Sequence, residues 1–398
     1  MKIYSPKLFL EIDHSKYIFA VGDKDEKKNF VLIHKCIVPA QGIEEFKITN
    51  FDLIYKTIKE NIYLIEQKLN FTFRDIVLII NNLNISFINL TGFKKLNGSQ
   101  ILKENITYIL NSLKSNLYET EEKKTIVHIF NSKYFLDKKE IENLPIGLFG
   151  DFYSQELSFS LLNSNDYKNL NNIFDKCNLK IKKIFLKSFV EGSFRINKNE
   201  KLDTFFQINI EKNNSQIFYF ENGALKFEQM FNFGSDLIIK DISKVTSLKI
   251  DIINEVLKSK NLIKDLLENE LIEKDFFKNK NYIKIKKKLI LDIAEARIEE
   301  ILNKIIIKNI NFTSFNKKEK IIFLKISDES HFNSFKKIYS LLFSKNSNLI
   351  LKFIERVKTE DLIKNANKLV HYGWNKEAIP VTHTKKSTIT KFFDILFN

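Results

Sequence analysis

The last ten residues of the chain carry the pattern whose chemistry is clearest from residue types and spacing. Five apolar side chains recur there at positions i, i+3, i+4, i+7 and i+8, so they share one face of a helix with 3.6 residues per turn. They are Ile389, Phe392, Phe393, Leu396 and Phe397. A short helix with an aromatic-rich apolar face is typical of segments that lie in the boundary between lipid headgroups and acyl chains.

Basic residues flank this helix, and a polar segment precedes it. The lysines are Lys385, Lys386 and Lys391, and the preceding segment 377–388 contains Pro380 with Ser, Thr and Lys. Because anionic headgroups attract such lysines, the pattern predicts a membrane-binding helix over 389–398 on a flexible linker. The alternative is a terminal helix packed on the protein's own core, which the linker, the lysines and the phenylalanines make less favourable.

No other group of residues has the spacing of a catalytic or metal site. Cys36 and Cys177 form no CxxC or Cys/His pattern, and the six histidines are scattered. No Ser/His/Asp or Cys/His set can be argued, so we predict no catalytic residue and no metal. Cysteine usage is typical of a cytosolic protein. The N-terminus is not expected to be a signal peptide, and no stretch reaches the ~18 apolar residues of a membrane span.

Composition sets wider limits on the class of protein. The chain has 398 residues, 44% of them hydrophobic, which is enough for two or more domains. Its net charge of +15 favours anionic partners, although Lys far outnumbers Arg and the charge is spread along the chain. A nucleic-acid-binding protein is disfavoured because Arg-rich or aromatic-interleaved patches are missing.

The elements that would position these residues alternate between short strands and helices. Strand patterns at 7–12, 17–21 and 31–38 precede a helix over Phe51–Leu69, in which Ile54, Ile58, Ile62 and Ile65 form one stripe. Further strands are predicted at 76–80, 85–90, 125–130, 134–136, 157–162, 181–185, 205–210, 216–220, 225–231 and 320–326. Further helices are predicted at 101–117, 163–178 and 331–343, with helical patterns dominating 236–307. This alternation predicts an α/β or α+β protein with several subdomains.

Several segments, taken in order, resemble one known family, the actin-like bacterial cell-division protein FtsA. Val127–Asp137 and then Ile141–Gly150 look like a stretch of the inserted 1C (SHS2) subdomain of that family. Asp175–Ile181 is similar to the helix-to-strand step that follows, and Glu221–Leu225 to a turn in the second actin-like half. Shorter similarities follow at Phe233-Gly234, Lys240–Ile242 and Asp292–Glu300. The terminal linker and helix match the family's membrane-targeting tail in kind and place.

The resemblance implies an actin-like (ribonuclease H-like) two-domain α/β fold with an inserted SHS2-type subdomain. The implied parts are 1A over 1–82 and 163–200, 1C over 83–162, 2A over 201–245, 2B over 246–310, the end of 2A with the return to 1A over 311–376, linker 377–388 and helix 389–398. It also implies a division protein at the cytoplasmic face of the inner membrane, which anchors the FtsZ ring there and helps assemble the septal ring. Its implied partners are the FtsZ C-terminal tail, anionic lipids, other division proteins and further copies of itself in dimers or filaments, with no nucleic acid.

The family holds ATP with Mg²⁺ between two glycine-rich turns, and both are altered here. The first turn falls at Asp13, His14, Ser15 and Lys16, where Asp13 replaces a glycine and Lys16 keeps its charge. The second falls at Asn209, Glu211, Lys212, Asn213 and Asn214, where Asn209 replaces an aspartate and three glycines are gone. A glycine pair on the adenosine side, near Ile326 and Ser327, is also missing.

Backbone N–H groups reach phosphates closely where no Cβ intervenes, so these losses predict weakened or lost nucleotide binding. We therefore expect the protein not to be an enzyme. Bound ATP with Mg²⁺, held through altered contacts, remains the alternative.

Arg297 and Glu300 lie one turn apart on a predicted helix, with Lys286, Lys287 and Lys288 upstream. Taken alone, they are an exposed ion pair. By resemblance, they lie where the acidic FtsZ tail binds. The alternative functions are an active actin-fold ATPase and a PilM-like pilus-assembly protein, with a nucleic-acid-binding protein less favoured.

Overall fold

A computed structural model describes most of the chain and divides it into two compact units. The described residues are 5–13, 15–24, 29–44, 47–81, 83–199, 201–258, 269–278, 281–315, 320–327, 329–345 and 348–378, with side chains in 329–345 only from Phe335 on. Unit 1 comprises Met1–Thr204, Phe220–Glu228 and Val357–Asn398. Unit 2 comprises Phe205–Tyr219 and Gln229–Arg356. The residues of the predicted terminal helix, and His14, lie outside the described part.

A mixed five-stranded sheet forms one core of unit 1, in the order β11-β6-β1-β2-β3. Its strands are β1 (Lys7–Ile12), β2 (Lys16–Lys24), β3 (Phe30–Pro39), β6 (Asp75–Ile80) and β11 (Lys180–Leu186). The β1, β2 and β3 strands run antiparallel in succession, whereas β6 pairs in parallel with both β1 and β11. A two-stranded sheet of β4 (Ile43–Glu44) and β5 (Lys47–Ile48) precedes the first helix.

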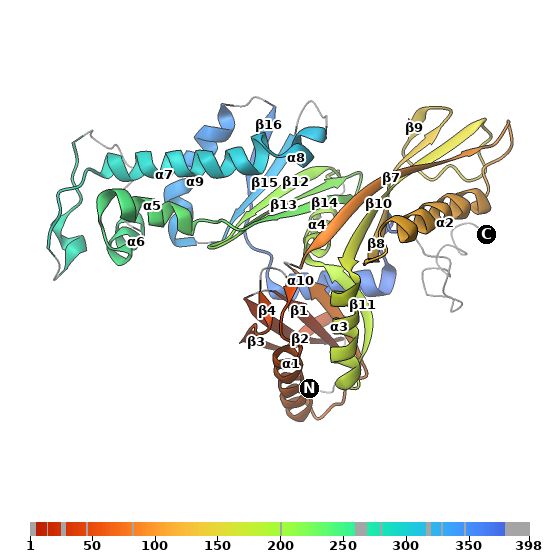
Figure 1. Cartoon of the computed structure of the whole chain (residues 1–398), viewed down its shortest axis with the longest axis horizontal. Helices are drawn as coiled ribbons and strands as arrows, with labels where there is room; N and C mark the ends of the chain where they lie inside the picture. The colour runs from red at the N-terminus through yellow and green to blue at the C-terminus, as the bar shows by residue number, and fades with distance from the viewer. Residues whose placement is uncertain are drawn as a thin grey trace. The chain divides into compact units, whose positions relative to one another are not determined.

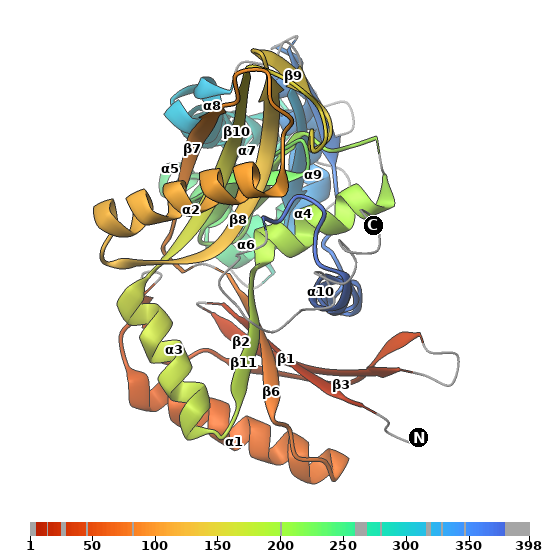
Figure 2. The ribbon, with the colours of Figure 1, turned by 90° about the vertical axis from the view of Figure 1, so that its right-hand side faces the viewer.

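Helices cover this sheet on both faces. The first, α1 (Phe51–Leu69), begins at Asn50, whose side chain accepts the Leu53 N–H, and ends at Asn70 in the left-handed conformation. Its four predicted apolar positions are all buried, which confirms the predicted stripe. Helix α3 (Ser164–Lys176) packs beside it. On the other face lies α10 (Thr359–Tyr372), packed on β2, β3 and α4 (Lys187–Lys198) (Figures 1 and 2).

A four-stranded antiparallel sheet with its own core is the second part of unit 1. Its order is β7-β10-β8-β9, with β7 (Ile85–Lys95), β8 (Lys124–Leu136), β9 (Lys139–Ile141) and β10 (Phe152–Asn163). Helix α2 (Lys103–Thr120) lies on one face (Figure 2). The two strands predicted over 125–136 are one continuous strand, β8, because two register shifts against β10 accommodate its irregularity without breaking it.

Unit 2 is built on another five-stranded sheet, in the order β14-β13-β12-β15-β16. Its strands are β12 (Phe205–Ile210), β13 (Ser215–Glu221), β14 (Ala224–Phe231), β15 (Lys320–Ile326) and β16 (Leu349–Phe353). The β12, β15 and β16 strands are parallel neighbours. The tips of β13 and β14 belong to unit 1, so the chain passes between the units along this hairpin.

The remaining helices of unit 2 lie between the β14 and β16 strands in the sequence. They are α5 (Asp236–Thr246), α6 (Ile250–Lys258), the 3₁₀ turn η2 (Lys274–Phe277), α7 (Lys287–Leu302), the π turn η3 (Asn303–Ile307), α8 (Ile310–Ser314) and α9 (Glu329–Ser344). The helical region predicted over 236–307 is therefore interrupted, first at Ser247, whose left-handed conformation ends α5. Across the described residues, no helix combines the length and apolarity needed to cross a bilayer.

Candidate functional site

The first predicted phosphate turn is a tight hairpin between β1 and β2. The Asp13 N–H donates to the Lys16 carbonyl at 3.1 Å. The Asp13 side chain is buried at 3% exposure and is held on both sides: its Oδ2 accepts from Asn81 Nδ2 at 2.9 Å, and its Oδ1 accepts from the Ser15 N–H at 3.3 Å. Ser15 is exposed and Lys16 partly exposed. The Asp13 carboxylate thus uses the Ser15 N–H, which a phosphate bound at the predicted turn would need.

Two buried charges that we did not predict lie in the same unit. Glu11, next to last in β1, is 2% exposed and accepts from Lys187 Nζ at 2.6 Å. Lys187 is the first residue of α4 and is itself 9% exposed. Burial alone would lower the pKa of Lys187, but the carboxylates of Glu11, Glu191 and Asp13 together raise it above the usual value. The ammonium is therefore charged at neutral pH.

The second predicted phosphate turn, in unit 2, joins β12 to β13 and supports the start of α5. The Glu211 N–H donates to the Asn214 carbonyl at 2.9 Å. The carbonyls of Glu211 and Lys212 accept, each at 2.9 Å, from the N–H groups of Ser235 and Asp236. This close approach requires Gly234 just before them, because a Cβ there would lie 2.1 Å from the Glu211 carbonyl oxygen.

Asn209, where the resemblance predicts an aspartate, belongs to a buried row of amides. Its Nδ2 donates to Gln216 Oε1 at 2.8 Å, and its Oδ1 accepts from Gln207 Nε2 at 2.8 Å. Asn209 is 4% exposed and Gln207 fully buried. A neutral amide engaged through both its oxygen and its nitrogen cannot supply the carboxylate that a magnesium ion prefers.

The residues at these two turns do not fit a nucleotide with Mg²⁺. In unit 1 the turn carries the buried carboxylate of Asp13, and the Lys187 ammonium neutralises the neighbouring Glu11. In unit 2 the amide of Asn209 is engaged by its neighbours, and the turn has no glycine. Among the residues that the structure describes, no group of three or more Asp, Glu, His or Cys could hold a metal ion.

The predicted FtsZ-binding pair lies on α7, where both residues are already in ion pairs. The Arg297 guanidinium bonds Asp241 of α5 and Glu300, and Lys304 Nζ lies 2.8 Å from Glu300. The hydrogen bond to Asp241 is the main reason that the pKa of Arg297 is raised. The hydrogen bond from Lys304 is the main reason that the pKa of Glu300 is lowered. The guanidinium is therefore a shared cation, with 24% of its side chain exposed.

No family model matches the chain. It is 22% identical over 234 residues to the cell division protein FtsA of Buchnera aphidicola subsp. Schizaphis graminum. This match covers 59% of this chain and 56% of that protein. It is also 22% identical over 296 residues to the cell division protein FtsA of Neisseria meningitidis serogroup B, covering 73% and 70%.

The chain is a divergent relative of the FtsA family. The match spans little more than half of the length of the Buchnera protein. Among solved structures, PilM from the PilM–PilN type IV pilus biogenesis complex matches 92% of this chain and 95% of its own, with 11% identity and a TM-score of 0.51. At that identity the likeness concerns the fold alone, and the predicted actin-like α/β fold is confirmed.

In this FtsA relative the chain is anchored to unit 1 where it leaves the described part. Trp374 donates from its indole nitrogen to the Gly223 carbonyl at 2.7 Å and packs edge-on against Phe189. The Ala378 N–H donates to the Ile129 carbonyl at 2.7 Å. Between them, Glu377 lies 3.2 Å from His128 Nδ1 and 3.0 Å from Lys183 Nζ. The first two residues of the predicted linker, Glu377 and Ala378, are thus held against β8.

The remaining predicted membrane-binding residues, Lys385, Lys386, Lys391, Ile389, Phe392, Phe393, Leu396 and Phe397, lie outside the described residues. Trp374, which comes just before them in the sequence, is partly buried and packs against Phe189 in unit 1. His128 of β8 is 1% exposed and stacks on Phe185 of β11.

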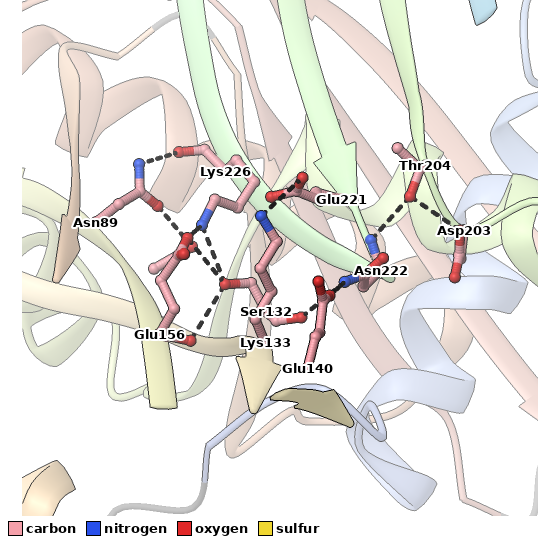
Figure 3. A network of polar contacts seen from close by, with 11 residues as sticks. Asn89, Ser132, Lys133, Glu140, Glu156, Asp203, Thr204, Glu221, Asn222 and Lys226 are labelled. Carbon is pink, nitrogen blue, oxygen red and sulfur yellow. Dashed lines mark hydrogen bonds and ion pairs between the residues drawn. The ribbon is translucent and has the colours of Figure 1, made fainter. Parts of the chain in front are cut away.

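A buried polar network ties the four-stranded sheet to the β13–β14 turn of this FtsA relative (Figure 3). Lys226 of β14 is 1% exposed, bonds Glu156 of β10, and donates to Ser132 Oγ at 3.0 Å. Lys133 of β8 pairs with Glu221 of β13 at 3.1 Å. The turn itself needs Gly223 at φ +77°, and the Asn222 side chain donates to the Ser132 carbonyl. The network therefore positions one part of unit 1 against another.

Replacing Lys226 with methionine is expected to lower the free energy of unfolding by about 3 kcal/mol, since Glu156 is then left largely buried without its counter-ion. Adding Glu156→Gln is expected to restore most of this loss. Urea unfolding checks both variants, with Lys139→Met on the exposed face of β9 as the matched control. Equal stability of the single and double variants would contradict the pairing.

Proposed function

We propose that this protein is a non-enzymatic cell-division protein that links FtsZ polymers to the cytoplasmic face of the inner membrane at the division site. The observation that carries the proposal is the match to four proteins named cell division protein FtsA, at 22–23% identity over 59–73% of this chain. The actin-like fold and the ordered motif similarities support it. The predicted terminal helix supplies the membrane contact.

The proposed membrane contact rests on the sequence of segment 389–398 and on the anchored residues Glu377 and Ala378 that precede it. Glu377 and Ala378 hold the chain against β8, so only the segment beyond them is available to reach lipid. Five apolar side chains at helical spacing and three nearby lysines suit an anionic surface. A single helix of this length binds reversibly, and several copies in one polymer bind firmly through avidity.

The FtsZ arm of the proposal assigns the acidic FtsZ tail to the α7 surface around Arg297 and Glu300. The residues Arg297 and Lys304 give this surface two cations beside Glu300. Because Asp241 already shares Arg297, an incoming carboxylate must compete with it. This competition favours a weak, reversible contact that many copies along a polymer strengthen.

The absence of ATPase activity is the third part of the proposal. Its support is the geometry of the two turns: the Asp13 carboxylate takes the Ser15 N–H, and the amide of Asn209 is engaged on both sides. We further propose that segment 83–162 is the SHS2-like 1C subdomain, that 246–310 is 2B, and that copies of the chain associate like actin into dimers or filaments. The separate sheet and core of segment 85–163 support the first of these assignments.

The experiment that tests the proposal is co-pelleting of purified FtsZ polymers with vesicles that contain anionic phospholipid. We expect FtsZ to enter the vesicle pellet only when the full chain is present. Deleting residues 389–398 should leave FtsZ in the supernatant. Arg297→Glu should keep the protein itself in the vesicle pellet but leave FtsZ in the supernatant. Lys240→Glu, an exposed charge reversal on α5, is the matched control for Arg297→Glu. FtsZ recruitment that survives the deletion would refute the tether.

A pilus-assembly role is the second candidate, because the PilM structure shares the fold over almost the full length of both chains. PilM was solved with PilN, so this candidate predicts binding to a PilN-type peptide. Fluorescence titration of a labelled FtsZ tail and a labelled PilN peptide against the same protein separates the two roles.

A further inference from the structure

The strand that leads into the first turn contains one charged residue in an apolar run. The four β1 residues around Glu11, namely Leu8, Phe9, Leu10 and Ile12, are all at most 1% exposed. A carboxylate in such surroundings is costly unless a counter-charge and hydrogen bonds compensate it. Lys187 Nζ, 2.6 Å away, supplies both.

Without the contact to Glu11, the position of Lys187 would be unfavourable for a cation. It is the first residue of α4, where the backbone N–H groups of the helix end already carry partial positive charge. It is also 9% exposed, and burial opposes its charge. Three carboxylates offset both effects: Glu11 bonds it directly, while Asp13 and Glu191 act through their charge and raise its pKa.

The Asp13 carboxylate completes the arrangement from the turn side. Its two oxygens accept from Asn81 and from the backbone of Ser15, so the turn is closed by bonds within unit 1. The carboxylates and the ammonium are all buried, and all belong to unit 1. Buried carboxylates need either an ion-pair partner or a bound metal ion, and a bound metal ion can leave.

We propose that Lys187 is a built-in counter-ion, whose ammonium takes the place of an exchangeable metal cation and keeps unit 1 in one state whether or not nucleotide is present. This proposal rests on the absence of ATPase activity proposed above. It adds the residue whose charge makes a bound cation unnecessary for the stability of unit 1. It also predicts that the conformation of unit 1 does not change when Mg²⁺ or ATP is added.

The test measures thermal unfolding of the full chain with and without Mg²⁺ and ATP. Wild-type protein is expected to keep the same midpoint in EDTA, in millimolar Mg²⁺ and in millimolar Mg²⁺ with ATP. Lys187→Met keeps the side-chain length but removes the charge, which should lower the midpoint by on the order of 10 °C. Lys198→Met, at the exposed end of the same helix, should stay within about 2 °C of wild type.

A double variant separates a counter-ion from a merely well-packed side chain. Glu11→Gln added to Lys187→Met removes the orphaned carboxylate and should recover at least half of the lost midpoint. No recovery would overturn the inference, as would a wild-type midpoint that rises by several degrees with Mg²⁺ and ATP. If Lys187→Met fails to fold, the double variant and the wild-type titration still decide. Neither measurement involves FtsZ or lipid, so a failure of the membrane tether leaves these results interpretable.

Discussion

Replacing Phe392 and Phe393 together with aspartate is expected to lower the affinity of the protein for anionic vesicles by about a hundredfold or more. Each phenylalanine transferred from water into an apolar layer contributes about 1.5–3 kcal/mol. Losing two therefore costs about 3–6 kcal/mol, and each 1.4 kcal/mol is a factor of ten in the dissociation constant. Both residues lie on the predicted apolar face of segment 389–398. Vesicle sedimentation over a range of lipid concentrations measures the effect.

A matched control adds the same charge away from the apolar face. Asn398→Asp, on the opposite side of the predicted helix, with Ser387→Asp in the preceding segment introduces two carboxylates, so electrostatic repulsion by the lipid is similar while the apolar contact is kept. We expect this control to bind vesicles far better than the phenylalanine variant. Equal binding by the two variants would show that the apolar face does not enter the bilayer.

The same variants distinguish a membrane helix from a helix packed on the protein itself. If the phenylalanines were part of the protein's own core, aspartate at these positions would lower the unfolding midpoint in lipid-free buffer. The membrane reading predicts no change in that midpoint, because the segment then contributes little to the folded body. Scanning calorimetry without lipid thus tests the alternative that sequence reasoning left open.

Helix α1 shows what a single sequence predicts well. Its four isoleucines recur at helical spacing, an asparagine caps its start, and a second asparagine ends it, so local signals and burial agree. Helix α4 shows the opposite. It carries Gly192 in its middle and buried polar residues such as Glu191, and neither is typical of a helix interior. Gly192 is explained only by the fold, since a Cβ would meet the Phe220 ring at 2.1 Å.

In the candidate site, too, the local features were predicted from the sequence and the long-range contact was not. The hairpin around Asp13 and the turn after Asn209 lie where local patterns predict them, because turn residues and strand alternation are short-range signals. The ion pair of Glu11 with Lys187 joins residues 176 positions apart. Only the parallel pairing of β1, β6 and β11 brings them together. A charge inside an apolar strand was the one available sign that a distant partner existed.

Replacing Glu377 with glutamine is expected to weaken the anchor before the tail and to remove part of the acid sensitivity of the protein. Burial alone would raise the pKa of Glu377, but the hydrogen bond from His128 and the charge of Lys183 lower it to about 2 from 4.5. A lowered carboxyl pKa stabilises the fold above pH 4.5, and this contribution is lost as the pH falls towards 2. At 1.36 kcal/mol per unit, it is on the order of 3 kcal/mol.

Burial lowers the pKa of His128 below 6.5, so the folded protein holds this imidazole neutral. Its contribution has the same sign, because the unfolded chain gains a proton as the pH falls below 6.5 and the folded chain does not. Wild-type stability should therefore begin to fall below pH 6.5 and fall further below pH 4.5. Glu377→Gln should lower stability at pH 7 and remove the second part of the decline.

Tryptophan fluorescence measures release of this anchor directly. Trp374 is the one tryptophan of the chain and lies three residues before Glu377. Its indole bonds Gly223 inside unit 1, so release of the segment exposes it to water and shifts its emission to longer wavelength. Glu360→Gln, an exposed change at the start of α10, is the matched control and should leave both emission and stability unchanged. If Glu377→Gln matched that control at every pH, the tail would be held by Trp374 and by the backbone bonds of Lys376 and Ala378 to β8, and the ion pair would have no part in fixing where the membrane segment begins.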